Sequence, residues 1–538
     1  MNRAAAAAAA IVLATLAGCA RTAIDAFEPN WARALERERE RFRPIPTPVF
    51  ALEGQAVAEP MPQADASGPL ELSLERAVVL ALARNPDLRV AELRPAIAGA
   101  FESIERGVFD PEFFARASVG TEESVETARA TGEQFPVRGD TRELQAGVRQ
   151  TLPSGTEVEL GLSQGRSASN RAPTQESARV GLTVTQSLLR GFGPAANLAR
   201  VRQAELDTLA SRYELRGFVE AMIADAEGAY WRYVLAGRRI AIFERSLELA
   251  RSQADEARQR VEVGVLPASD RAAFEVEVAR RQQALIDARA QEAAARIEIL
   301  RLVGGLGDHQ PHAHDRPVIA TTTPEADPTP IDDGAERIEL ARRVRPDLAE
   351  SRLRLEQNRL EVIATRRGLL PRLDAFVALG KTGFADSFGQ SIENLGQDTF
   401  DATVGIRFSQ SLGRLVAKGQ QQAAIASRQQ AAAAVANLEQ IVASDVRLAI
   451  IEVERAGRQI AASATTRDLQ QQLAQAELER FEAGVGTALL VAQAQRDLLE
   501  AEIAQVAAVV QYRLALIALY LAEGSLLERR GITISTDP

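Results

Sequence analysis

The chain has 538 residues, of which 46% are hydrophobic and 25% are charged, a composition typical of folded rather than disordered proteins. The formal net charge of −10 argues against nucleic acid as a partner, because phosphate binding requires clustered cations. Aromatic residues make up only 5% of the chain, which favours long helices with small contact residues over a bulky rounded core.

The N-terminus predicts export followed by lipidation. Arg3 precedes a short alanine-rich stretch, which is typical of a secretory signal and too short to span a membrane stably. The small residues Ala17 and Gly18 directly before Cys19 resemble the bacterial lipobox, and this resemblance implies cleavage before Cys19 and its acylation. The alternative is a free cysteine that happens to end a signal peptide. Because Cys19 is the one cysteine, a disulfide within the chain is excluded.

We therefore expect a lipoprotein signal peptide over residues 1–18 and an extended, lipidated tether over residues 19–71, which is rich in proline. Helical periodicity begins at Leu72 and is interrupted at Asn85-Pro86. A second helix is expected from about Pro86 to Arg106.

The periodicity then changes from helical to alternating, which predicts strands with one apolar and one polar face. The segments lie around residues 113–119, 144–149, 158–162 and 179–185, and again around 373–379 and 400–408. A length of about 8–12 residues suits tilted barrel strands, although a water-soluble sandwich would give the same alternation. The expected lipid-facing residues are Val180, Leu182, Val184, Val404 and Ile406. The expected water-facing residues are Arg179, Thr183, Thr185, Asp401 and Arg407.

Two very long helical patterns follow, over about residues 194–263 and 412–482, each on the order of 100 Å at 1.5 Å per residue. A glycine turn and a returning helix come after each, and the first returning helix is expected over 269–302.

The whole order of short helices, strands, long helix, glycine turn and returning helix occurs twice in the sequence. Asn85-Pro86-Asp87-Leu88 is echoed 260 residues later, Gln186-Ser187-Leu188 only 224 residues later, and the glycine turns are 220 residues apart. The fall from 260 to 224 assigns 36 extra residues to the first half, around a hairpin at 144–162 that either widens a barrel or forms an external cap. We expect a first repeat over 72–303, a linker over 304–334, a second repeat over 335–523 and a C-terminal tail over 524–538.

This duplicated order of short helices, strand hairpin, very long helix, glycine turn and returning helix resembles the TolC-like outer-membrane efflux protein family. The resemblance covers nearly all of residues 72–523. It implies a mixed α and transmembrane β fold, namely a trimeric TolC-like α/β-barrel in which long helices form a periplasmic tunnel and the strands share one outer-membrane barrel. It also implies a homotrimer that docks onto a periplasmic adaptor and an inner-membrane efflux or secretion transporter. The chain would then be a passive, lipid-anchored exit duct in the outer membrane, with no cofactor and no catalytic activity.

In this family the two glycine turns are the periplasmic tips, where adaptors dock and the tunnel narrows. The matching docking residues are Gly264, Val265, Leu266, Asp270, Gly484, Val485 and Gly486, and the candidate aperture residues are Asp270, Arg271, Phe481, Leu490 and Gln493. Asp270 matches an aspartate of the family's closing network, but Phe481 and Gly486 occupy its partner positions. Leu490 and Gln493 occupy the acidic ring positions, so the polar lock does not transfer. An ordinary helical turn would need the same glycines, and Asp270 capping its helix is an equal alternative.

The sequence disfavours two other functions. A periplasmic lipoprotein adaptor, or a helical scaffold of an export complex, is disfavoured by the duplicated hairpin and long helix. A secreted hydrolase is disfavoured because no nucleotide loop, nucleophile–histidine–acid set or zinc signature is found. His309, His312 and His314 lie together in the linker without a nearby cysteine, and we expect no metal site there.

Overall fold

The computed structural model describes residues 69–127, 129, 131–304, 316–397 and 400–532. These residues form two compact units. A sheet unit comprises residues 95–210 and 351–434, and a helical unit comprises the remaining described residues. Cys19 and the three histidines of the linker lie outside the described residues.

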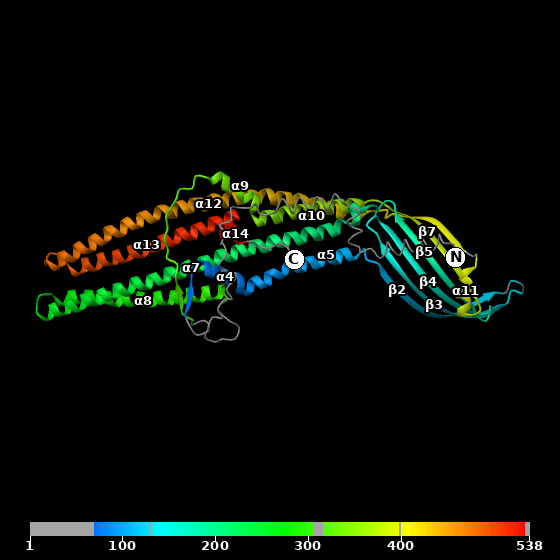
Figure 1. The fold of residues 1–538 in the computed structure, drawn as a ribbon, viewed down its shortest axis with the longest axis horizontal. Helices are drawn as coiled ribbons and strands as arrows, with labels where there is room; N and C mark the ends of the chain where they lie inside the picture. The colour runs from blue at the N-terminus through cyan, green and yellow to red at the C-terminus, as the bar shows by residue number, and fades with distance from the viewer. Residues whose placement is uncertain (1–68, 128, 130, 305–315, 398–399, 533–538) are drawn as a thin grey trace. The chain divides into compact units, whose positions relative to one another are not determined.

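The sheet unit contains one antiparallel six-stranded sheet in the order β2-β3-β4-β5-β7-β8 (Figure 1). Its strands are β2 (Glu112–Thr127), β3 (Gln134–Thr151), β4 (Thr156–Ser169), β5 (Gln175–Ser187), β7 (Arg372–Ala385) and β8 (Asp401–Ser409). All six predicted strand segments are confirmed. The short helices α11 (Phe388–Glu393) and η2 (Asn394–Gly396) lie in the connection between β7 and β8 and contact β5 and β7.

The expected strand length of about 8–12 residues is wrong for most of the sheet, because β3 has 18 residues and β2 has 16. The ladder between them continues from Gly120↔Thr141 to Thr127↔Gln134. Polar residues occupy both faces of this outer part, so apolar alternation no longer marks it although the backbone hydrogen bonds persist.

The duplicated order of helices is also confirmed. The first half has α4 (Leu74–Arg84), α5 (Pro86–Gly107), α6 (Pro194–Asn197), α7 (Ala199–Glu262) and α8 (Ala268–Leu302), and the second half has α9 (Gly334–Val344), α10 (Pro346–Gly368), α12 (Leu415–Glu482) and α13 (Ala488–Glu523). The two very long helices, α7 with 64 residues and α12 with 68, each begin in the sheet unit and continue into the helical unit. At 1.5 Å per residue each is about 100 Å long.

Leu72 lies in a strand rather than in the predicted helix. β1 (Leu70–Leu72) pairs in parallel with β6 (Val318–Ala320), which lies inside the segment expected to be a linker. Tyr230 of α7 holds the pair in place, since its hydroxyl accepts a hydrogen bond from the Thr322 backbone N–H at 2.9 Å and donates to the Leu72 carbonyl at 3.3 Å. Three-residue strands are too short to show a periodicity, and their pairing across about 250 residues is not visible in local sequence.

The segment expected to be a C-terminal tail is partly buried. α13 ends at Glu523. The next residue, Gly524, has a φ of 68°, which suits a left-handed helix cap, and α14 (Leu526–Arg529) follows. Leu526 and Leu527 pack against Val219 and Ile223 of α7 in one apolar cluster. α13 is apolar and long enough to cross a membrane by composition alone, but it packs against α8, α9 and α14 within the helical unit.

Candidate functional site

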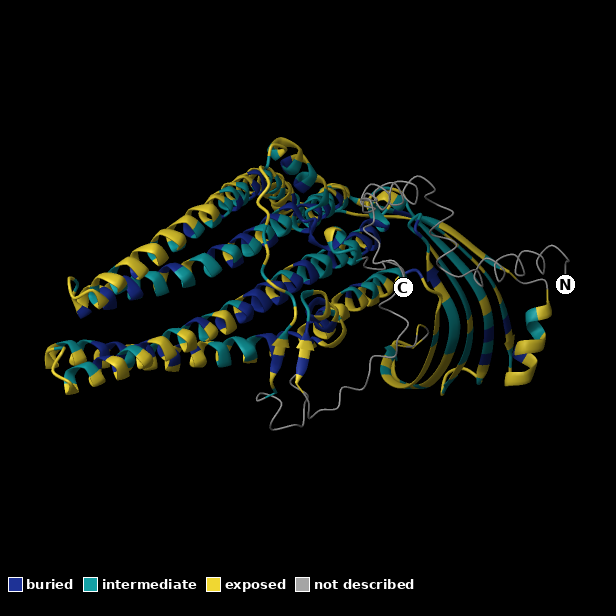
Figure 2. Ribbon diagram, turned by 60° about the vertical axis from the view of Figure 1, so that its left-hand side comes forward, coloured by how far each residue is buried: buried dark blue, intermediate teal, exposed yellow. Residues whose placement is uncertain are grey.

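One face of the six-stranded sheet carries an apolar row that runs from edge to edge. Directly paired residues share a face, and one such row joins Phe113, Val148, Leu160, Leu182, Leu379 and Ala402 across all six strands. The next row contains Val184, Val377 and Val404. In Figure 2 the strands are mostly intermediate or exposed, and Val404 keeps 78% of its surface accessible. An exposed apolar face of this extent needs a covering medium or partner.

The opposite face is polar and carries ion pairs. Arg179 on β5 and Asp401 on β8 were both predicted to face water, and their side chains meet at 2.6 Å. Arg149 donates a hydrogen bond to Glu112 across β2 and β3 at 2.8 Å, and its guanidinium lies over the Phe114 ring. The residues predicted to face lipid and those predicted to face water therefore occupy separate faces of the sheet.

The sheet has two open edges. β2 and β8 stand at the ends of the strand order, so each pairs on one side only among the described residues. The helix α5 also carries an exposed apolar stripe at spacings of three and four residues. Its members, each between 55% and 67% exposed, are Val90, Leu93, Ile97, Phe101 and Ile104.

The two glycine turns have the same local geometry. Gly264 and Gly484 have φ values of 77° and 78°, a region that favours glycine. In the first turn the Val265 N–H donates to the Arg260 carbonyl at 2.9 Å, and in the second the Val485 N–H donates to the Arg480 carbonyl at 3.0 Å. These bonds satisfy carbonyl groups that the helix end leaves free. The side chains of Val265 and Val485 are both more than two-thirds exposed.

The other residues of the two turns have packing or backbone roles. Leu266 is half-buried and packs with an apolar cluster that includes Phe274 of α8 and Val491 of α13, so the cluster joins the two helical hairpins. A Cβ at Gly486 would lie 2.9 Å from the Phe481 backbone nitrogen, so glycine is required there for close approach. Thr487, not a residue singled out from the sequence, caps α13 by accepting a hydrogen bond from the Leu490 N–H.

The candidate aperture residues lie in different surroundings. Phe481 stacks edge-on against Phe274 of α8, with ring centroids 5.7 Å apart, inside an apolar cluster. Leu490 and Gln493 are exposed on α13, and Arg271 pairs with Glu275 at 3.6 Å. A small cavity beside Phe481 is lined by Gln253, Glu256, Ala257, Arg260, Leu266, Phe274, Leu478 and Glu482.

Asp270 does not cap α8. The N-cap residue is Pro267, and no side chain makes a capping hydrogen bond there. Asp270 lies in the first turn of the helix, where a carboxylate is favoured by the helix dipole. The capping alternative was wrong because the chain enters this helix through proline, which places Asp270 inside the helix rather than at its boundary.

A buried ionic network joins α7, α8 and α13, and it was not predicted from the sequence. Arg281 of α8 is 4% exposed and donates to Glu277 at 3.1 Å, to Ser246 of α7 at 2.8 Å and to Gln495 of α13 at 3.5 Å. Arg496 of α13 also donates to Glu277, at 3.2 Å. The network joins three helices close to the tips, and breaking a buried pair leaves an uncompensated charge. The spacing of four residues between Glu277 and Arg281 was the available signal, but it also occurs on solvated helix faces.

A second buried carboxylate lies on α7. Glu220 is 1% exposed and accepts a hydrogen bond from Arg216 at 3.1 Å, while Arg216 also binds Glu528 of α14. Burial raises the pKa of Glu220 from its usual 4.5 to about 7, against the opposing effect of Arg216, and the charges of Glu528 and Asp347 add to the rise.

This pKa predicts a pH-dependent stability. Folded Glu220 holds its proton more tightly than the unfolded chain does, so its contribution is complete below about pH 4.5 and is lost as the pH rises towards about 7. The Glu220→Gln variant should lack this dependence, which is on the order of 3 kcal/mol. Thermal unfolding of wild type and variant between pH 4.5 and 8 measures it. A stability difference that stays constant over this range would contradict the assignment.

Both the sequence and the fold of the chain are similar to known proteins. The sequence matches the family described as outer membrane efflux protein over residues 77–305 and 338–525. A search of curated protein sequences finds no match.

Solved structures show the same fold. The Campylobacter jejuni CmeC outer membrane channel is 16% identical, with a TM-score of 0.63, and the alignment covers 84% of this chain and 85% of CmeC. The open state of the Neisseria gonorrhoeae MtrE outer membrane channel is 19% identical, with a TM-score of 0.58 and coverage of 86% and 91%. The outer membrane protein VceC from Vibrio cholerae is 16% identical, with a TM-score of 0.61 and coverage of 84% and 96%.

Proposed function

Since the chain belongs to the outer membrane efflux protein family, we propose that it is a passive exit duct in the bacterial outer membrane, serving a tripartite efflux or type I-like secretion system. The observation that carries this proposal is the six-stranded sheet with one apolar and one polar face. A sheet of this kind crosses a bilayer when its apolar face meets lipid and its polar face lines water. The chain then conducts substrates and catalyses no reaction.

The duct is formed by three copies of the chain. An open sheet cannot remain in hydrocarbon, because the unpaired N–H and C=O groups of β2 and β8 would have no partners there. Pairing β8 of one copy with β2 of the next removes both edges and closes a barrel. The exposed apolar stripe of α5, which includes Ile97 and Phe101, supports a neighbouring subunit as its cover.

The two glycine turns are the surfaces for a periplasmic adaptor, which in turn connects the duct to an inner-membrane efflux or secretion transporter. Val265 and Val485 supply exposed apolar contacts on turns whose backbone is fixed by hydrogen bonds. Residues Gly264, Leu266, Asp270, Gly484 and Gly486 complete the docking surface. The aperture is lined by Asp270, Arg271, Phe481, Leu490 and Gln493, and its closure depends on apolar packing such as that between Phe481 and Phe274.

The N-terminus anchors the duct to lipid. Residues 1–18 are removed as a signal peptide, Cys19 is acylated, and residues 19–71 form the tether. Replacing the thiol by a hydroxyl in Cys19→Ser should abolish metabolic labelling with a radioactive fatty acid, because no other cysteine is present. Labelling that persists in Cys19→Ser would contradict lipidation at this residue.

Membrane fractionation tests the proposed location. After separation of inner and outer membranes on a density gradient, the full-length protein should sediment with the outer membrane and show a spectrum containing β-structure. Recovery with the inner membrane would argue against an outer-membrane barrel and would support the adaptor or scaffold alternative.

A further inference from the structure

The additional hairpin of the first half, β3 and β4, lies in the middle of the sheet. Its two strands and their turn occupy residues 134–169, the 36 residues by which the first repeat exceeds the second. β3 pairs along its length with β2, and β4 pairs with β5. The hairpin therefore separates strands that would otherwise be neighbours, and it does not fold over the end of the sheet.

The outer face of the hairpin continues the apolar face of its neighbours. Leu160 stands directly opposite Val148 on one side and Leu182 on the other, and Val158 stands opposite Val184. Leu144 and Leu162 are each about half exposed. A hairpin covering the channel from outside would have no reason to keep the lipid-facing register of β5 and β7.

The polar face of the sheet, opposite the apolar row, provides a second and independent observation that the hairpin belongs to the barrel wall. Four glycines are directly paired in one row across β3, β4, β5 and β7, namely Gly147, Gly161, Gly181 and Gly380. Larger side chains lie over both ends of this row. A Cβ at Gly147 would meet the Phe114 ring at 2.8 Å, and one at Gly380 would meet the Arg179 guanidinium at 2.8 Å. Glycines on one face let a sheet curve towards that face, which is how barrels are bent closed. Half of the glycine row belongs to the hairpin.

We propose that β3 and β4 are a permanent part of the lipid-facing wall, so that three copies of the six-stranded sheet close an eighteen-stranded barrel with a widened outlet. This inference rests on the proposed trimeric duct. Barrel diameter grows roughly in proportion to strand number, so the hairpin makes the outlet about one and a half times as wide as twelve strands would. Its cross-section becomes about twice as large, a size at which barrels hold an open aqueous channel.

Nitroxide spin labels at single introduced cysteines test the position of the hairpin in reconstituted bilayers. The label at Leu160→Cys on β4 is compared with Leu182→Cys on β5 and with the inward-facing Glu159→Cys as a matched control. Wild type, with Cys19 alone, gives the background. The labels at positions 160 and 182 should collide with oxygen dissolved in lipid, and the label at 159 should collide with a water-soluble nickel chelate.

A label at position 160 that meets the nickel chelate while the label at 182 meets oxygen would overturn the inference and leave the duct intact. Water access at both 160 and 182 would overturn the proposed membrane barrel itself. A second variant lacks residues 134–169, which joins β2 to β5 and keeps them antiparallel. Its barrel should be about one-third narrower in electron micrographs of the trimer. An unchanged diameter would contradict an eighteen-stranded wall.

Discussion

The Leu182→Arg variant is expected to lose assembly in the outer membrane. Leu182 lies between Leu160 and Leu379 in the apolar row of the sheet. A guanidinium on the lipid face near the midplane costs about 2–4 kcal/mol per site, and the proposed trimer would carry the substitution three times. The yield of oligomer extracted from outer membranes and resolved by native electrophoresis measures the effect. We expect that yield to fall at least tenfold.

Thr183→Arg is the matched control, because it introduces the same side chain one residue along the same strand. Thr183 lies on the polar face opposite Glu159, so the new guanidinium meets water and a carboxylate. The oligomer yield of Thr183→Arg should remain close to that of wild type. Equal losses in both variants would show that an added arginine is equally harmful on the two faces of β5, and would contradict the assignment of faces.

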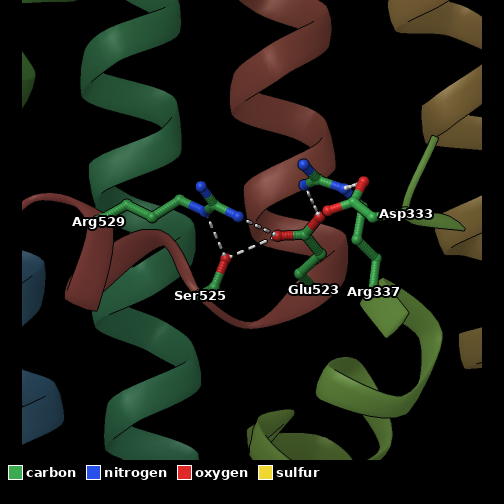
Figure 3. A network of polar contacts seen from close by, with 5 residues as sticks. All are labelled: Asp333, Arg337, Glu523, Ser525 and Arg529. Atoms are coloured by element: carbon green, nitrogen blue, oxygen red, sulfur yellow. Dashed lines mark hydrogen bonds and ion pairs between the residues drawn. The ribbon is translucent and has the colours of Figure 1, made fainter. Parts of the chain in front are cut away.

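Glu523→Ala is expected to destabilise the helical unit by about 3–5 kcal/mol, the range for breaking a buried ion pair. Glu523 at the end of α13 is fully buried and accepts hydrogen bonds from Arg337 at 2.5 Å, Ser525 at 2.8 Å and Arg529 at 3.2 Å (Figure 3). Arg337 also forms an ion pair with Asp333, at 2.6 Å. Removal of the carboxylate leaves Arg337 with Asp333 as its one remaining carboxylate partner among the described residues and takes the Glu523 carboxylate away from Arg529. Chemical denaturation followed by circular dichroism measures the loss.

An exposed ion pair on α12 provides the comparison. Glu452 binds Arg455 at 2.7 Å, and both side chains are more than one-third exposed. Glu452→Ala should cost no more than about 1 kcal/mol, because solvent already screens the pair. If Glu523→Ala were no more destabilising than Glu452→Ala, the network at the end of α13 would not hold α9 and α14 in place.

Features with a long local repeat could be predicted from the sequence. α7 and α12 show helical periodicity over more than 60 residues, and Val180, Leu182 and Val184 alternate with polar neighbours on β5. Gly264 and Gly484 were identified because a helix that reverses needs a residue with positive φ. The duplication itself strengthened each assignment, because the second half repeated the order of the first.

Features that depend on contacts between distant residues could not be predicted. The pairing of β1 with β6 and the contacts of Arg281 with Ser246 and Gln495 join segments with no common local pattern. The outer parts of β2 and β3 pair through the backbone and through polar side chains such as Glu123 and Arg138, so they lack the apolar alternation that predicts a strand. Asp270 failed as a cap because an acidic residue near a helix start fits both the cap and the first turn.

The central claim is that one chain supplies an open six-stranded section of a barrel that only copies of itself can close. Native mass spectrometry of the full-length protein, extracted from the outer membrane in mild detergent, tests this most directly. We expect a species with three times the mass of the mature subunit. A folded monomer that retains its β-structure as the dominant species would contradict it, because the edges of β2 and β8 would then be closed by something other than a second copy.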